Sequence, residues 1–294
     1  MRVYNLGSIN IDHIYRLSHL PQPGETLLAT EYLCCLGGKG ANQSLALALG
    51  GAKVVHIGRM AAKDRFLIQP LLDAGVNVEH VVDDASSTAS AVVLVDEANG
   101  ENQIVINPGA NQQISEAQVS AALKSASKGD WALTQNETNQ VPFFLQQAKS
   151  QGLRICYSAA PFVAATAAQL LPLVELLVVN QIEAQALADN LGVGLDQIPV
   201  PHLIITLGAM GARYIGVEGD WQLAAPKVQA VDTTGAGDTF LGFMLAALTQ
   251  GLAMRDAIQQ ALFAAALQVT RKGTAEAIPT RAEVDDFKAD AIFV

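Results

Sequence analysis

The sequence predicts an α/β fold, in which a mostly parallel sheet is covered by helices on both faces and carries a small second sheet. Short apolar runs alternate with longer helical patterns along most of the 294 residues, and this repetition favours parallel strand pairing. Half of the residues are hydrophobic and 16% are charged, an ordinary globular composition without signs of disorder. Glycine or polar residues interrupt every apolar run before it reaches membrane-spanning length, so no membrane partner is expected.

The strands of the main sheet are predicted from apolar runs that are too short to be helices. They cover residues 3–7, 54–58, 131–134, 153–157, 176–179 and 203–207. Helical patterns are found between them at 41–49, 115–127, 141–150 and 181–189. The last third of the chain becomes helical, with patterns at 238–250, 254–269 and 281–288.

Two segments break this alternation, residues 10–36 and 87–109. Both lack a helical pattern and carry Val, Ile, Tyr and Thr between turn signals such as Pro23-Gly24 and Asn99-Gly100. We expect them to form a small β-sheet over the α/β body, and we call these two segments the lid. Because no interdomain linker or internal repeat is found, residues 1–294 are interpreted as one domain with a discontinuous lid.

Charge and cysteine usage exclude several classes of function. A formal net charge of −10 and a pI near 4.9 argue against nucleic acid and anionic membranes as partners, because both require basic faces. Cys34, Cys35 and Cys156 form no CxxC pair and no disulfide framework, which is typical of a reducing compartment. Residues 1–7 have the pattern of a strand rather than of a signal peptide, so we expect a cytoplasmic protein.

The most informative segment is the glycine-rich turn at residues 235–238. Gly235 and Gly237 flank Ala236, so the backbone is free to adopt positive φ and a ligand is able to approach its N–H groups closely. An apolar run compatible with a helix starts at Asp238, which places the turn at a helix N-terminus with unpaired donors suited to a phosphate. A carboxylate beside such an anion site indicates a base that deprotonates the attacking group, and therefore phosphoryl transfer.

A second polar cluster contains Gly38, Lys39 and Asn42. Its glycines expose backbone to a polar ligand and its side chains supply donors, but a flexible helix entry is an equally good interpretation. The spacing of a P-loop is absent. Asn10 and Asp12 follow the first strand, at the edge where parallel sheets bind ligands, although Asp12 taken alone is better explained as a turn or capping residue.

Taken together, these motifs resemble the ribokinase-like (PfkB) carbohydrate kinases along nearly the whole chain, and ribokinases most closely. The resemblance rests on the order and spacing of residues 7–12, 23–26, 37–43, 180–183, 205–208, 232–240 and 269–273. It implies a three-layer α/β/α body with a β lid. It also implies transfer of the γ-phosphate of ATP, with Mg²⁺ as cofactor, to the primary hydroxyl of ribose or a related furanose.

The resemblance assigns roles to catalytic and sugar-binding positions. It implies that Asp238 is the general base and that the backbone of Gly235, Ala236 and Gly237 forms the anion hole. The implied sugar contacts are Asn10, Asp12, Gly38, Lys39, Asn42, Glu137 and Asp238 itself. Polar groups of this kind suit a sugar because each buried hydroxyl left unpaired would weaken binding.

Further positions match the nucleotide and magnesium contacts of the family. Asn180, Thr206, Gly208 and Gly237 match cofactor contacts, and Glu183 completes the motif that orients Mg²⁺ through waters. Taken in isolation, Asn180 and Glu183 are equally compatible with a helix N-cap and its reciprocal N3 carboxylate.

A monovalent-cation site is also implied, because ribokinases bind potassium beside the anion hole. The matching positions are Asp232, Thr234, Gln268, Arg271 and Gly273, the last three through backbone carbonyls. The final ligand of the family, commonly a Ser hydroxyl, falls on Ala277. Because a water can replace one oxygen ligand, we expect potassium activation nevertheless.

Besides Ala277, the chain departs from the ribokinase pattern at four places outside the glycine turn. Ser158 stands where the family has Asn, Gln181 replaces an acidic residue, and a Gly-Asp-Asp motif is reduced to Asp64. The segment between Asn180 and Thr206 is also shorter than in ribokinases, by roughly two to three helical turns. A fructokinase or a nucleoside kinase of the same family is therefore an alternative, as is a sugar-binding protein without catalysis. The exposed strand edges of the lid predict a homodimer formed through the lid.

Overall fold

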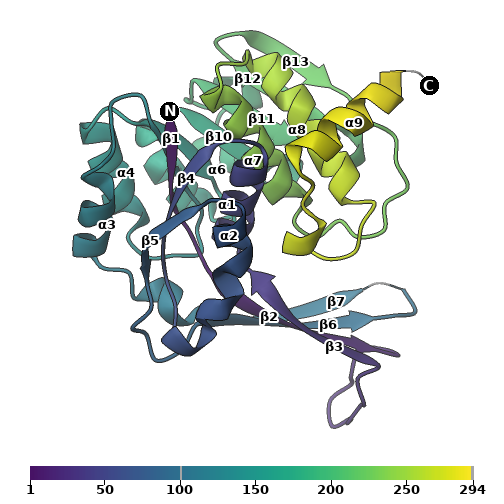
Figure 1. Ribbon diagram of the computed structural model, residues 1–294. Coiled ribbons are helices and arrows are strands. Elements are labelled where there is room, and N and C mark those ends of the chain that lie inside the picture. Colours follow the sequence, from purple (N-terminus) through teal and green to yellow (C-terminus); the bar gives the residue numbers. More distant parts are fainter. Residues whose placement is uncertain (100, 293–294) are drawn as a thin grey trace.

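The computed structural model describes residues 1–99 and 101–292, and its body is built on a nine-stranded sheet (Figure 1). The strand order is β13-β12-β11-β10-β9-β8-β1-β4-β5. Neighbours from β11 to β5 are parallel, whereas β12 and β13 add an antiparallel hairpin at one edge. The strands are β1 (Arg2–Leu6), β4 (Lys53–Arg59), β5 (Asn77–Val82), β8 (Trp131–Thr134), β9 (Arg154–Ser158), β10 (Leu176–Asn180), β11 (His202–Thr206), β12 (Ala212–Gly216) and β13 (Gly219–Leu223).

All six strands predicted for the main sheet are confirmed, and β5, β12 and β13 extend the sheet beyond them. The apolar runs are continuous because the central strands are buried on both faces. In β1, Val3 packs into one core and Tyr4 into the other, and both are fully buried. The predicted turn residue Gly100 and residues 293–294 lie outside the described residues.

Helices cover both faces of the sheet and produce the predicted three layers. One core joins the sheet to α1, α2, α7, α8 and α9, and the other joins it to α3, α4, α5 and α6. Their bounds are α1 (Lys39–Leu49), α2 (Gln69–Asp73), α3 (Glu116–Leu123), α4 (Val141–Ser150), α5 (Ala164–Leu170), α6 (Gln181–Leu191), α7 (Ala236–Thr249), α8 (Met254–Gln268) and α9 (Arg281–Ile292). Within the described ranges, none of these helices combines the length and the apolar character that a membrane crossing requires.

The helix predicted over 115–127 is shorter than expected. Ser115 caps α3 by accepting the N–H of Gln118 at 3.2 Å, but the helix ends at Leu123. The chain then turns through Asp130, whose Oδ2 accepts the N–H of Ser127 at 3.0 Å. A local side-chain bond to the backbone therefore competes with continuation of the helix.

Helices α1 and α7 cross closely, which brings their N-termini to the same edge of the sheet. Gly242 of α7 lies so near α1 that a Cβ there would meet the Cβ of Ala46 at 2.4 Å. The small residues at this crossing allow the two helix backbones to approach. Because Lys39 starts α1 and Asp238 lies in the first turn of α7, this crossing determines how far apart the two side chains lie.

The lid segments contain a separate four-stranded sheet that projects from the body (Figure 1). Its order is β3-β2-β6-β7, with β2 and β6 parallel and the outer pairs antiparallel. The strands are β2 (Asn10–Leu17), β3 (Glu31–Gly37), β6 (Ala89–Asp96) and β7 (Asn102–Asn107). The predicted α/β class with a small β-sheet is therefore confirmed.

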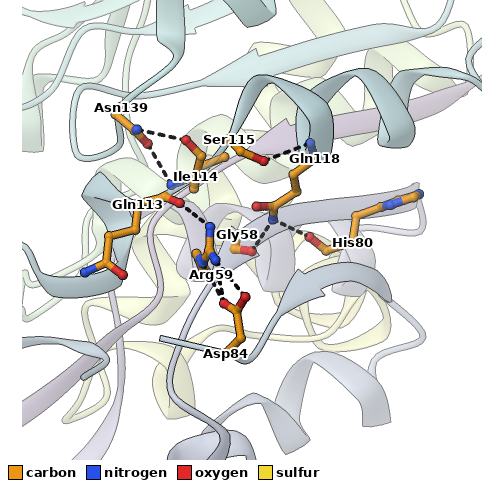
Figure 2. A network of polar contacts seen from close by, with 9 residues as sticks. All are labelled: Gly58, Arg59, His80, Asp84, Gln113, Ile114, Ser115, Gln118 and Asn139. Carbon is orange, nitrogen blue, oxygen red and sulfur yellow. Dashed lines mark hydrogen bonds and ion pairs between the residues drawn. The ribbon is translucent and has the colours of Figure 1, made fainter. Parts of the chain in front are cut away.

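A polar network fastens the returning end of the lid to the body (Figure 2). Arg59 donates to both carboxylate oxygens of Asp84 at 2.8 Å, and to the Gln113 carbonyl. Asn139 exchanges two hydrogen bonds with the backbone of Ile114, at 3.1 and 2.9 Å. These contacts fix the chain between β7 and α3, so the lid strands start from a defined base.

Candidate active site

The predicted site residues gather at the carboxyl edge of the large sheet, beside the N-termini of α1 and α7. Asn10 follows β1, Glu137 follows β8 and Asn180 ends β10. Helix α1 contributes Lys39, and α7 contributes Asp238. The carboxyl ends of parallel strands are the usual ligand-binding edge of an open α/β sheet.

The N-terminus of α1 is capped by protein groups. Glu137 Oε2 accepts the Lys39 N–H at 2.9 Å and the Ser8 hydroxyl at 2.5 Å. The Oγ of Ser8 accepts the Gly40 N–H at 3.0 Å, and the Ser8 carbonyl accepts the Ala41 N–H at 2.9 Å. One carboxylate oxygen of Glu137 is thus used in the structure, which leaves Oε1 for a ligand.

The N-terminus of α7 is open by comparison. Gly235 precedes the helix in the left-handed conformation with φ of 75°, and the Ala236 N–H donates to the Thr233 carbonyl at 3.3 Å. Among the described residues, the N–H groups of Gly237 and Asp238 have no backbone partner outside the helix. A Cβ at Gly237 would meet nothing within 4 Å, so a ligand has room there. Of the three predicted anion-hole residues, Gly237 therefore combines an unengaged N–H group with open space for a ligand.

Asp238 is buried and is held by two side-chain amides. Gln43 Nε2 donates to Oδ1 at 2.8 Å, and Asn42 Nδ2 lies 3.4 Å from Oδ2. Burial raises the pKa of Asp238, and this effect outweighs the opposing effects of Lys39 and the two amides. A carboxylate with a raised pKa is a stronger proton acceptor than an exposed one.

The side chain of Lys39 is half-buried in a carboxylate-rich environment. Burial alone would lower the pKa of Lys39, but attraction by Asp238, Glu137 and Glu183 raises it overall. None of the ion pairs in the described part of the chain involves Lys39. Its donors are therefore available to an anionic or hydroxylated ligand.

Asp12 lies on β2 of the lid, with its carboxyl group against Gly37 of β3. A Cβ at Gly37 would lie 2.1 Å from that carboxyl group, so any larger residue there would displace the Asp12 side chain. Burial, followed by the charges of Glu137 and Glu276, raises the pKa of Asp12 to about 6. Its Oδ1 is buried and has no partner among the described residues. Such an orphaned acceptor is costly unless a ligand supplies a donor.

Asn10 and Gly38 complete the sugar-side group. The Oδ1 of Asn10 accepts from Asn111 Nδ2 at 2.8 Å, and Asn111 Oδ1 accepts the Ile9 N–H at 3.1 Å. Gly38 adopts φ of 92°, a conformation that favours glycine, at the entry to α1. The side-chain Nδ2 of Asn10 is left to donate to a ligand.

Asn180 and Glu183 form a capping box at the start of α6, as the structural interpretation of this pair predicts. The Asn180 N–H donates to Glu183 Oε2 at 2.8 Å, and the Glu183 N–H donates to Asn180 Oδ1 at 2.9 Å. Each side chain keeps its second polar atom. Thr206 lies beside Asn180 in the register of β10 and β11, and Gly208 starts the turn after β11 with φ of 57°.

The predicted potassium ligands lie on two segments that Asp232 joins. Its Oδ1 accepts the Thr234 N–H at 2.9 Å and its Oδ2 accepts the Gly273 N–H at 3.2 Å. One predicted ligand carbonyl, that of Gln268, accepts the Arg271 N–H at 2.9 Å and keeps a second lone pair. The Thr234 carbonyl accepts from Gln268 Nε2 at 3.0 Å. Ala277 is buried and offers no side-chain oxygen.

Four residues of the site are missing from the predicted set, although Ser8 and Gln43 belong to the motifs at 7–12 and 37–43. Gln43 contacts Asp238, Gln135 contacts Gln43 at 2.6 Å, Ser8 holds Glu137, and Asn111 holds Asn10. The position of Gln135, a polar residue directly after an apolar strand, was a usable signal. The others depend on contacts between distant parts of the chain.

Comparison with known proteins agrees with this geometry. Residues 2–281 match the family model described as pfkB family carbohydrate kinase. A ribokinase of Haemophilus influenzae is 33% identical over 298 residues, which is 96% of each chain. The structure of an Arabidopsis thaliana ribokinase complexed with ribose and ATP superposes with a TM-score of 0.84 at 26% identity, covering 97% of this chain and 98% of that one.

A Burkholderia thailandensis nucleoside kinase in complex with inosine is also similar, with a TM-score of 0.84 and 25% identity over 99% of this chain and 98% of that one. The three-layer body and the second sheet are therefore those of a family that phosphorylates alcohol groups. This chain belongs to the pfkB family of carbohydrate kinases.

Proposed function

We propose that this protein transfers the γ-phosphate of ATP to the primary hydroxyl of ribose or a related furanose, with Asp238 as general base. The observation that most supports this proposal is that the buried Asp238 carboxylate lies in the first turn of α7, beside the open N-terminus of that helix. The base and the phosphate site lie within one helical turn, as an in-line attack requires. Similarity to ribokinases, one of them complexed with ribose and ATP, supports the choice of substrates.

In this proposal, residues of the body and lid hold the sugar while Asp238 removes the proton. Two buried oxygens, Asp12 Oδ1 and Asn42 Oδ1, have no partner among the described residues and would accept sugar hydroxyls. Glu137 Oε1 would accept a third, and Asn10 Nδ2 and Lys39 would donate. As the hydroxyl attacks, the N–H of Gly237 and the helix dipole of α7 would stabilise charge on the transferring group.

The nucleotide and its metal would lie along the strand ends next to this site. Glu183 keeps Oε1 free beyond the capping box, which suits Mg²⁺ held through water. When bound, Mg²⁺ would neutralise charge on the phosphates. Thr206 and Gly208 line the same edge. An apolar cavity of about 550 Å³, with Leu223, Leu262, Phe263 and Phe287 in its walls, would accept the adenine ring.

Potassium activation belongs to the same proposal and carries its own test. Support comes from Asp232, which ties the two segments of the implied site together. The Gln268 carbonyl accepts one hydrogen bond, from the Arg271 N–H, and its second lone pair would face the cation. We expect higher turnover in potassium chloride than in tetramethylammonium chloride at equal ionic strength. Equal turnover in the two salts would remove the claim.

A homodimer formed through the lid is the proposed assembly. The apolar residues Leu33, Ile104 and Ile106 are 43%, 53% and 52% exposed on β3 and β7. Side chains alternate between the two faces of a sheet, and the strand registers place all three on the same face of the lid sheet as Asp12. An exposed apolar sheet of this kind favours a second copy. We also propose one domain over the whole chain and a cytoplasmic location, supported by three free cysteines.

Release of ADP with a series of acceptors tests the function. Ribose, 2-deoxyribose, fructose and inosine are compared at equal concentration, and we expect the largest kcat/KM with ribose. Inosine as the best acceptor would favour the nucleoside kinase alternative, which the Burkholderia relative supports. Acceptor binding without ADP release would favour the non-catalytic alternative.

The Asp238→Asn variant tests the assignment of the base. It should lower kcat by about 10²–10⁴-fold, because the proton acceptor is lost, while the dissociation constant of the sugar stays near its normal value. Near-normal turnover of this variant would refute the assignment.

A further inference from the structure

A chain of buried side-chain hydrogen bonds leads from Asp238 into the core, away from the sugar side. Gln43 Nε2 donates to Asp238 Oδ1 at 2.8 Å, and Gln135 Nε2 donates to Gln43 Oε1 at 2.6 Å. Gln135 Nε2 also donates to Asn5 Oδ1 at 3.0 Å. These three amides come from α1, from the segment after β8 and from β1, and each is at most 1% exposed.

The direction of every bond in this chain is determined by one backbone carbonyl. Asn5 Nδ2 donates to the Gly40 carbonyl at 2.9 Å, and a carbonyl only accepts. Asn5 must then present Oδ1 to Gln135, so Gln135 must present Nε2. Because Gln135 Nε2 points at Gln43, Gln43 must turn Oε1 toward it and Nε2 toward Asp238. The orientation of each amide thus follows from the network itself.

We propose that Gln43 is a positioning residue for the catalytic base: it holds Oδ1 of Asp238 and thereby directs Oδ2 at the acceptor hydroxyl. The inference rests on the proposed kinase function. Oδ2 has only the 3.4 Å contact with Asn42, so it is the oxygen left to receive a proton. Gln135 and Asn5 act one and two steps further away, by fixing which end of the Gln43 amide faces the carboxylate.

The chain orients Asp238 without taking up its proton. The charged groups that act on Asp238 are Lys39 and Glu137, and neither belongs to the chain. At the far end, Asn5 Nδ2 donates to Ser44 Oγ at 2.8 Å, and Ser44 contacts His56. Burial lowers the pKa of His56 to about 4, so it is neutral in the working range. Amides that neither gain nor lose a proton give the base a fixed rotamer at every pH.

The test compares Gln43→Met with Gln118→Met, a matched change of a buried glutamine outside the site. Gln118 Nε2 donates to the Gly58 and His80 carbonyls at 2.7 and 2.9 Å (Figure 2). Gln43→Met should lower kcat about 10- to 100-fold, with the sugar KM within about twofold. Gln118→Met should leave both constants unchanged while lowering stability.

Two further variants separate positioning from folding. Gln135→Met leaves Gln43 in place but allows the Gln43 amide to rotate. This variant should therefore also lower kcat, by a smaller factor than Gln43→Met. In the Asp238→Asn background, Gln43→Met should have no further effect on kcat, because a residue that acts through the base has nothing left to hold. Equal losses in kcat for Gln43→Met and Gln118→Met, or additive losses in the double variant, would overturn the positioning role.

A readout independent of turnover is the pKa of Asp238, measured by carboxyl ¹³C NMR titration and identified with Asp238→Asn. Loss of the Gln43 donor should raise this pKa by about 1, because the hydrogen bond favours the ionised form. The acid limb of the pH–rate profile should move upward with it. An Asp238 pKa that is the same in the wild type and in Gln43→Met would refute the hydrogen bond from Gln43 to Asp238. Absence of sugar-dependent turnover in the wild-type protein would refute the kinase proposal and leave the NMR result to decide the role of Gln43.

Discussion

Replacing Asp12 by Asn should stabilise the ligand-free protein at neutral pH and weaken its affinity for the sugar. Burial and the charges of Glu137 and Glu276 raise the pKa of Asp12 from 3.8 to about 6. Its Oδ1 is buried without a partner among the described residues, so the folded protein bears the cost of an uncompensated carboxylate. An Asn side chain of nearly the same shape carries no charge and removes that cost.

The magnitude follows from the two pKa values. Because the folded state binds this proton more tightly than the unfolded state, Asp12 adds most stability when protonated, and stability falls as the pH rises through 4 to 6. A shift from 3.8 to about 6 corresponds to a cost of about 3 kcal/mol at pH 8. The same relation leaves a cost of about 1.6 kcal/mol at pH 5.

Urea unfolding of the wild type and of Asp12→Asn between pH 5 and pH 8 measures this difference. The variant should be more stable at pH 8, and its advantage should shrink by about 1.4 kcal/mol toward pH 5. Asp189→Asn is the matched control, because it removes one exposed carboxylate on α6 and should change stability by less than about 0.5 kcal/mol. An advantage of Asp12→Asn that is absent at pH 8, or that does not vary with pH, would refute the reasoning.

Three further predictions concern other parts of the site and the lid. Glu137→Ala should lower the free energy of unfolding by about 1–3 kcal/mol and raise the sugar KM, because the Lys39 N–H loses its buried acceptor; unchanged thermal unfolding would contradict this. Ile104→Glu combined with Ile106→Glu should convert a dimer into a monomer in light scattering, and a wild-type monomer at micromolar concentration would count against the lid interface. Iodoacetamide should modify the exposed Cys34 before Cys35, because burial raises the pKa of the Cys35 thiol to about 12; mass spectrometry of digested protein decides the order.

Local patterns explain why much of this fold was predictable. The six central strands are apolar runs buried on both sides, so their signal does not depend on which neighbour pairs with them. The turn before α7 was predictable because positive φ at Gly235 and the start of an apolar helix are both local properties. The predicted end of α3, at residue 127, was wrong, because the Asp130 side chain accepts the Ser127 N–H in place of a helical carbonyl.

The contacts that give the site residues their properties depend on the tertiary structure. Glu137 was predicted as a sugar contact, yet one of its oxygens caps α1, a helix about a hundred positions earlier in the chain. Asn180 and Glu183 use half of their polar atoms on each other. Gln43 belongs to the motif at residues 37–43. Its proposed positioning role, however, depends on the approach of α1 to α7 and on the hydrogen-bond direction that the Gly40 carbonyl imposes on the amides.

The amino-acid sequence was enough to predict the chemistry, because a glycine turn, a helix start and a carboxylate within residues 235–238 together indicate a phosphate site beside a base. The tertiary structure decided which helix N-terminus is open. That of α1 is capped by Glu137 and Ser8, whereas that of α7 keeps the Gly237 N–H free beside unfilled space. The physical reason is that a hydrogen-bond donor is available to a ligand only if no other part of the chain reaches it, and long-range packing decides that.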